Sequence, residues 1–231
     1  MTGVITLGVS TAEQGGSLAI VNDSRLLCEE YWNDRQTHSK RLLVMIEHLI
    51  KHRAGLQLVE IDAFVAARGP GSFTGLRIGI SVIKGLAYAC QKPEIGVSTL
   101  DGIAYRLRYS NLPVCVMMDA KREEVYTAVY RFDRGRLASK SPESVVSPEK
   151  AVSMANGPAI FTGSGSKAYQ DIISSRVSQP VVTSACFDHA SAAALIHAAS
   201  LQAESEHHTQ PFLVEPVYLR KSDAEMNASK G

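Results

Sequence analysis

The first thirty residues alternate between short hydrophobic runs and polar turns. Three runs, residues 4–11, 16–22 and 25–31, are rich in Val, Ile and Leu, and Asn22-Asp23 supplies turn chemistry between the second and the third. Short hydrophobic runs bounded by turn residues are typical of strands. The pattern therefore predicts a three-stranded β-meander.

After this meander the hydrophobic residues recur at spacings of three and four. The residues at these spacings are Leu42, Met45, Ile46, Leu49 and Ile50. This period is typical of one face of a helix, and charged residues occupy the other faces. The spacing predicts an amphipathic helix over residues 38–53.

A buried strand predicted at 61–68 leads through a glycine-rich turn into a second helix, from about Gly75 to Cys90. Nearly every position in this helix is apolar or glycine, apart from one polar stripe formed by Arg77, Ser81, Lys84 and Tyr88. A helix this apolar must be covered on more than one side. Its own sheet can cover one side, and we expect another polypeptide on the other; complete cover by this chain is the alternative.

Two glycines inside that second helix support the same expectation. Gly79 and Gly85 each cost about 1 kcal/mol relative to alanine in a helix interior. Close approach by a neighbouring backbone is the compensation that we expect.

The second half of the chain repeats the order of the first. Residues 113–120, 124–132 and 134–140 predict another meander, and superimposing 4–11 on 113–120 places Ser10 opposite Asp119. Each half then continues to a strand that ends in glycine, "VAARGPG" and "AIFTGSG". We interpret this as a duplicated α/β lobe, although chance similarity between two meanders remains an alternative.

The turn-forming stretch "RYSNLP" is the predicted crossing between the two lobes. This gives an N-terminal lobe over residues 1–107 and a C-terminal lobe over 108–207. A C-terminal segment near 208–231 is expected to join the N-terminal lobe.

The glycine-rich stretch "GPGSFTG", residues 69–75, matches none of three known loop motifs. The P-loop and the dinucleotide fingerprint both need glycine where Thr74 stands, and the nucleophile elbow needs glycine at both Pro70 and Thr74. What remains is a tight turn at a helix start, which either holds an anion weakly or packs closely as a strand-to-helix connection. The candidates for a degenerate nucleotide or anion loop are Ser10, Thr11, Gly69, Gly71, Ser72, Asp119, Gly163 and Gly165.

Composition narrows the function classes. The chain has 231 residues, 45% of them hydrophobic, which is enough for a substantial core. The 24 Lys and Arg nearly cancel the 23 Asp and Glu, so there is no large basic field to gather nucleic acid. The four cysteines lack CxxC spacing, the N-terminus lacks the features of a signal peptide, and no apolar run approaches the roughly 20 residues of a membrane span. We therefore expect a cytoplasmic protein without membrane contact.

Four stretches carry a family resemblance: "ARGPGSFTGLRIGISVIKGLAYA", "PEIGVSTL", "MMDAKREEVY" and "EPVYLR". Together they resemble the TsaB (YeaZ) family of bacterial tRNA threonylcarbamoyladenosine-modification proteins. The resemblance covers almost the whole chain. It implies an α/β fold of two duplicated ribonuclease-H-like lobes, as in the actin, Hsp70 and sugar kinase superfamily.

The resemblance also implies a function. Proteins of this family pair with their paralogue TsaD, which with the ATPase TsaE transfers threonylcarbamoyl from threonylcarbamoyl-AMP to the adenosine beside the anticodon. The chain is thus expected to be a noncatalytic scaffold or activator that meets tRNA indirectly, through the complex, and forms a homodimer when alone. The alternative is an ATP-binding phosphotransferase of the actin-like superfamily, with "FTGSGS" beneath the adenosine.

Groups that catalytic relatives use are missing here. The metal-binding His-x-x-x-His of TsaD corresponds to "GVSTLDGI", residues 96–103, where Thr99 and Ile103 stand at the ligand positions. Ser10 stands where relatives usually have an aspartate, which is a natural Mg²⁺ anchor. We therefore expect no catalytic residue, no metal, no cofactor and no peptidase activity.

The resemblance and the two helices together predict the surface that pairs with TsaD. The predicted interface residues are His38, Leu42, Met45, Leu49, Arg77, Ile78, Ser81, Val82, Gly85 and Ala89.

Overall fold

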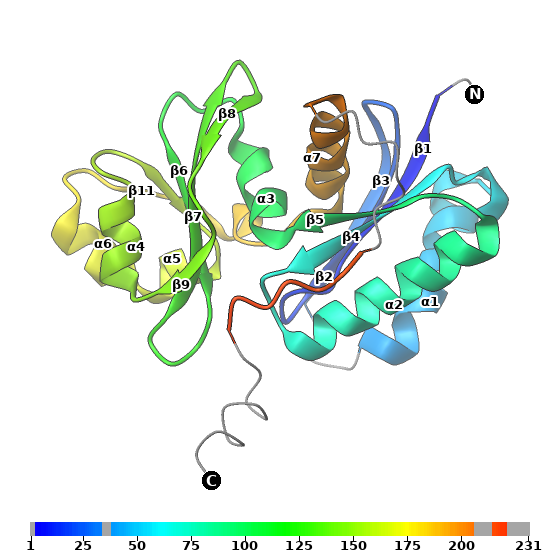
Figure 1. The fold of residues 1–231 in the computed structure, drawn as a ribbon, viewed down its shortest axis with the longest axis horizontal. Helices are drawn as coiled ribbons and strands as arrows, with labels where there is room; N and C mark the ends of the chain where they lie inside the picture. The colour runs from blue at the N-terminus through cyan, green and yellow to red at the C-terminus, as the bar shows by residue number, and fades with distance from the viewer. Residues whose placement is uncertain (1–2, 34–37, 206–213, 221–231) are drawn as a thin grey trace, which may run out of the picture. The chain divides into compact units, whose positions relative to one another are not determined.

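The computed structural model describes residues 3–33, 38–205 and 214–220, which form two compact units (Figure 1). Unit 1 runs to Arg106 and resumes from His189 to Pro216. Unit 2 runs from Leu107 to Asp188 and resumes at Val217. Each unit is built around one β-sheet.

The sheet of unit 1 begins with the predicted meander. Its strands are β1 (Ile5–Ser10), β2 (Gly16–Asn22), β3 (Arg25–Trp32), β4 (Ala63–Gly69) and β5 (Glu94–Ser98), in the order β3-β2-β1-β4-β5. The first three strands are antiparallel, whereas β4 and β5 run parallel to β1. All six residues of β1 are buried, as expected for a central strand covered on both faces.

Helices cover both faces of this sheet (Figure 1). The helix predicted at 38–53 is α1 (His38–His48) continued by the π-helical turn η1 (Leu49–Ala54), and a short 3₁₀ turn, η2 (Leu58–Glu60), precedes β4. The second predicted helix is α2 (Phe73–Cys90), which packs on β4 and against α1. On the other face lie α3 (Thr99–Ala104), which leads into η3 (Tyr105–Leu107), and α7 (Ala192–Ser205).

Unit 2 has a sheet in the order β11-β10-β6-β7-β8, with β9 paired to β7. Its strands are β6 (Val114–Asp119), β7 (Val125–Asp133), β8 (Arg136–Lys140), β9 (Ser144–Val146), β10 (Ile160–Thr162) and β11 (Val181–Val182). Its helical segments are α4 (Pro148–Met154), α5 (Ser164–Ala168), α6 (Gln170–Arg176) and η4 (Ala185–Phe187). A buried cluster around Cys115, Met117 and Phe161 lies between this sheet and α4 and α6.

The two sheets have the same topology, which confirms the α/β fold and the duplicated ribonuclease-H-like lobe. Each consists of a meander whose first strand, β1 or β6, is followed outward by two parallel strands. Ser10 and Asp119 are the last residues of β1 and β6, so they occupy equivalent positions in the two units.

The division of the chain differs from the predicted one at residues 189–207. The sequence placed them in the C-terminal lobe, whereas α7 packs on the sheet of unit 1, where Ile196 lies against Gly8 of β1. Hydrogen bonds as well as apolar packing hold α7 on unit 1. The Glu29 carboxylate accepts hydrogen bonds from Ser191 Oγ (2.7 Å) and from the Ala193 amide (3.2 Å) at the start of α7.

The C-terminal segment divides between the units. Val214 is buried in unit 1, where its N–H donates to Glu94 (3.0 Å), and residues 217–220 belong to unit 2. Residues 208–213 and 221–231 of the predicted segment lie outside the described residues.

Helix α2 also bears on the membrane prediction. By length and composition it is sufficient to cross a bilayer, contrary to the expectation that no apolar run comes near that length. A core helix of a soluble protein passes the same test, and one side of α2 packs on β4, β1 and β5.

Candidate functional site

The inner side of α2 is packed against the residue that follows β1. Thr11 Oγ1 donates a hydrogen bond to the Gly75 carbonyl (2.7 Å), and a Cβ at Gly75 would lie 2.0 Å from the Thr11 carbonyl oxygen. A Cβ at Gly79 would lie 2.3 Å from Thr11 Oγ1. These two glycines are therefore explained by close approach within the chain. For Gly79 the neighbour is the Thr11 side chain, whereas the sequence predicted a neighbouring backbone.

The opposite side of α2 faces outward. We call it the outer face and define it by Arg77, Ile78, Ser81, Val82, Gly85, Tyr88 and Ala89. Tyr88 is 88% exposed, Arg77, Ser81 and Ala89 are exposed, and Ile78 and Val82 are half-buried. No described atom lies within 4 Å of a Cβ built at Gly85. The described chain therefore gives no packing reason for glycine at this position.

On α1 and its continuation η1, the structure corrects two of the predicted interface residues. Leu42 and Leu49 are 1% and 0% exposed, so they belong to the core of unit 1. Their spacing marks the inward side of the helix, which sequence alone does not distinguish from a docking side. Leu43 and Val44, which were not predicted, are 53% and 64% exposed.

Two of the predicted interface residues on α1 remain, Met45 and His38. Met45 is half-buried. Helix α1 begins at His38, but the His38 side chain lies outside the described residues.

The glycine turn of unit 1 is filled by the chain itself. The Ser72 N–H donates to the Ala12 carbonyl (2.7 Å), and Ser72 Oγ caps α2 by accepting from the Gly75 N–H (3.3 Å). A Cβ at Gly71 would lie 2.4 Å from the same Ala12 oxygen. Of the two interpretations of "GPGSFTG", this geometry favours the close-packed strand-to-helix turn, in which Ser10 and Thr11 are both buried.

In unit 2 the end of β6, which is equivalent to the end of β1, is also in contact with the chain itself. The Asp119 carboxylate accepts from the Lys121 N–H (2.8 Å) and pairs with Lys121 Nζ (2.6 Å). Gly163 and Gly165 approach β6 so closely that a Cβ would lie 2.5 Å and 2.9 Å from the Met117 carbonyl oxygen. Burial, together with the negative charges of nearby carboxylates, Asp119 first among them, raises the pKa of Tyr169. The predicted loop residues thus form two separate sets, one in each unit.

Sequence reasoning missed how the β6–β7 loop is held. Lys121, Arg122 and Glu123 all have left-handed backbone conformations, with φ of 60°, 55° and 57°, which costs roughly 1–2 kcal/mol each for a residue with a side chain. Arg220 offsets this cost, because its guanidinium donates to the Ala120 carbonyl (2.6 Å) and pairs with Glu124. The sequence signal for this contact was the arginine of "EPVYLR". It lies about 100 residues from the β6–β7 loop in sequence, and only the fold brings it to the loop.

The positions that the resemblance aligns with metal ligands do not fit a metal. Thr99 and Ile103 lie one helical turn apart on α3 and are 0% exposed. Thr99 Oγ1 has no hydrogen-bond partner among the described residues, and a threonine hydroxyl and a hydrocarbon are not ligands that bind zinc or iron. Within residues 3–33, 38–205 and 214–220, no three His, Cys, Asp or Glu side chains gather as a metal-binding group would require.

Comparisons with known proteins agree with the fold and identify relatives. The family model described as "TsaD: tRNA N6-adenosine threonylcarbamoyltransferase" matches residues 26–228. The tRNA threonylcarbamoyladenosine biosynthesis protein TsaB of Escherichia coli is 33% identical over 172 residues, covering 72% of this chain and 74% of that protein. The protein of the same name from Haemophilus influenzae is 31% identical over 198 residues, covering 80% of this chain and 81% of that protein.

Among solved structures, YeaZ from Pseudomonas aeruginosa superimposes with a TM-score of 0.79 at 30% identity. The match covers 94% of this chain and 100% of that one.

Proposed function

Because the chain belongs to the TsaB (YeaZ) family of tRNA threonylcarbamoyladenosine biosynthesis proteins, we propose that it serves this tRNA modification as a noncatalytic subunit. It docks through the outer face of α2 and the exposed apolar residues of α1 on a TsaD-type threonylcarbamoyltransferase. By docking it stabilises the active form of that enzyme. The transferase in turn receives threonylcarbamoyl-AMP and modifies the adenosine beside the anticodon.

One observation carries the docking surface. Gly85 lies within an 18-residue helix, costs about 1 kcal/mol there relative to alanine, and has no described atom near its Cβ position. The other two helix glycines compared above, Gly75 and Gly79, are both explained by contact with Thr11. A partner backbone that approaches α2 at Gly85 supplies the missing reason.

The family model supports this choice of partner, because its description names the transferase and it matches most of this chain, so the chain and the transferase are related. A self-complementary patch gives a two-fold pair, so the same surface serves a homodimer when the transferase is absent. The ATPase TsaE completes the complex, tRNA is contacted through the transferase, and the complex is cytoplasmic.

A catalytic role is not proposed because the groups it needs are replaced. Thr99 and Ile103 stand at the metal positions, and Ser10 stands at the end of β1 in place of a carboxylate. In unit 1 the turn amide of Ser72 is bonded to the chain itself, and in unit 2 Asp119 is held by Lys121. These contacts weigh against the alternative of an ATP-binding phosphotransferase, and calorimetry with Mg-ATP tests that alternative.

Size-exclusion chromatography of this chain mixed with its TsaD-type paralogue tests the proposal. We expect co-elution of the wild-type chain and loss of co-elution for Ser81→Glu, which puts a charge on the outer face without disturbing a buried group. The matched control is Ser175→Glu on α6, also an exposed helix position, which is expected to co-elute normally. Co-elution of both variants with the paralogue would rule out this surface.

A further inference from the structure

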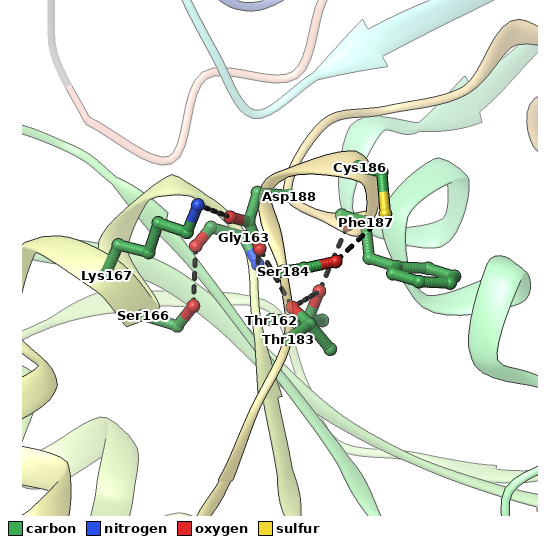
Figure 2. Close-up of polar contacts among 9 residues, drawn as sticks. All are labelled: Thr162, Gly163, Ser166, Lys167, Thr183, Ser184, Cys186, Phe187 and Asp188. Carbon is green, nitrogen blue, oxygen red and sulfur yellow. Dashed lines mark hydrogen bonds and ion pairs between the residues drawn. The ribbon is translucent and has the colours of Figure 1, made fainter.

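A carboxylate of the chain itself lies at the glycine turn of unit 2. Asp188 follows η4 and is 8% exposed (Figure 2). Its Oδ1 accepts hydrogen bonds from Thr183 Oγ1 (2.8 Å) and from the Gly163 N–H (3.3 Å). Its Oδ2 faces Lys167 Nζ at 3.2 Å, an ion pair whose geometry is not that of a directed hydrogen bond. Three donors thus converge on one carboxylate.

These donors come from two segments, α5 with its N-cap residue and the residue after β11, and their directions are set by the fold. Gly163 follows β10 as the N-cap residue of α5, with φ of 100°, and Ser166 Oγ donates back to its carbonyl (2.7 Å). Thr183 follows β11, and Lys167 lies on α5 (Figure 2). Since a hydroxyl has one hydrogen and a carboxylate is a stronger acceptor than a hydroxyl, Thr183 donates to Asp188 rather than to Thr162 Oγ1, which lies 2.9 Å away.

The donor set is that of a site for a small oxyanion. A backbone N–H, a hydroxyl and an ammonium group are the groups that proteins direct at carboxylate and phosphate oxygens. Without an anion, the buried Gly163 N–H would lose its acceptor, which is costly for a buried donor, whereas Thr183 Oγ1 keeps Thr162 Oγ1 at 2.9 Å as another acceptor. An anion therefore satisfies all three groups at once, and in this chain the Asp188 carboxylate is that anion.

We propose that Gly163 N–H, Thr183 Oγ1 and Lys167 Nζ form an oxyanion-binding site that the Asp188 carboxylate occupies, so that Asp188 excludes free carboxylates and phosphates from the glycine turn of unit 2. The tethered carboxylate competes at a high effective concentration, which free anions at millimolar levels do not match. This inference is independent of the docking surface on α2.

Replacing Asp188 with alanine opens the site, and sodium formate is the probe because it restores the carboxylate that was removed. The thermal unfolding midpoint is measured in increasing formate, with sodium chloride keeping the ionic strength constant. For Asp188→Ala we expect a saturable rise with a dissociation constant on the order of millimolar. For the wild-type chain and for Asp171→Ala, an exposed carboxylate on α6, we expect no saturable rise.

Two further variants separate anion binding from a general salt effect. Asp188→Asn fills the same volume, so formate is expected to leave its midpoint unchanged. Lys167→Met in the Asp188→Ala background removes the cationic donor and is expected to weaken formate binding by about tenfold. If Asp188→Ala does not fold in chloride, its refolding yield in formate gives the same test, with recovery as the expected result.

Either of two results would overturn the inference. One is an Asp188→Ala variant that neither binds formate saturably nor refolds in it, which would make Asp188 a structural acceptor only. The other is a wild-type chain that responds to formate with the same affinity as the variant, which would show that Asp188 does not compete for the site.

Discussion

Glutamate in place of Gly85 is expected to weaken pairing with the TsaD-type paralogue by roughly 100-fold or more, because an unpaired carboxylate would be buried where the two backbones meet. The isolated chain should remain folded, since the position is open and glutamate is a better helix former than glycine. Isothermal titration calorimetry measures the affinity, and circular dichroism shows that the variant is folded.

Alanine at the same position separates the effect of Gly85 on the stability of the isolated chain from its effect on pairing. Gly85→Ala is expected to raise the free energy of unfolding of the isolated chain by about 0.5–1 kcal/mol, because glycine is conformationally costly in a helix. The same methyl group should weaken pairing, because it enters the space that the partner backbone occupies. A variant that is more stable and pairs as tightly as wild type would leave Gly85 without the role assigned to it.

Alanine at Gly75, on the opposite side of the same helix, is expected to destabilise the chain by about 3 kcal/mol. Its Cβ would lie 2.0 Å from the Thr11 carbonyl oxygen, so α2 would have to move away from β1, with the cost of overpacking. Urea unfolding of Gly75→Ala and Gly85→Ala in parallel measures the change in the free energy of unfolding for each variant. The two changes should have opposite signs. Equal shifts would mean that the close contact of Thr11 with α2 does not determine where glycine is required.

Much of this fold could be predicted from the period of the hydrophobic residues. The first meander appears within one or two residues of its predicted positions, and Ser147 caps α4 as its place before Pro148 suggests, with Ser147 Oγ accepting from the Lys150 N–H (3.3 Å). Long, periodic segments carry this information locally. The two-residue strand β11 and the three-residue strand β9 are too short to show a period.

The candidate site was harder to predict because it depends on which side of a helix faces inward. Gly79 and Gly85 look alike in sequence, yet one meets Thr11 and the other has no described atom within 4 Å of its Cβ position. Leu42 and Leu49 fit a docking stripe equally well until their burial is known. The Asp188 contacts could not be foreseen either, because its donors Gly163 and Lys167 lie more than twenty residues away in the chain.

The most direct measurement of the central claim is transfer of threonylcarbamoyl to tRNA by the TsaD-type enzyme with TsaE, as this chain is titrated in. The account predicts that the wild-type chain raises the rate to a plateau and that the chain alone transfers nothing. It also predicts that Gly85→Glu fails to activate at the concentrations where wild type saturates. Activation by Gly85→Glu equal to wild type, or transfer by this chain alone, would contradict it.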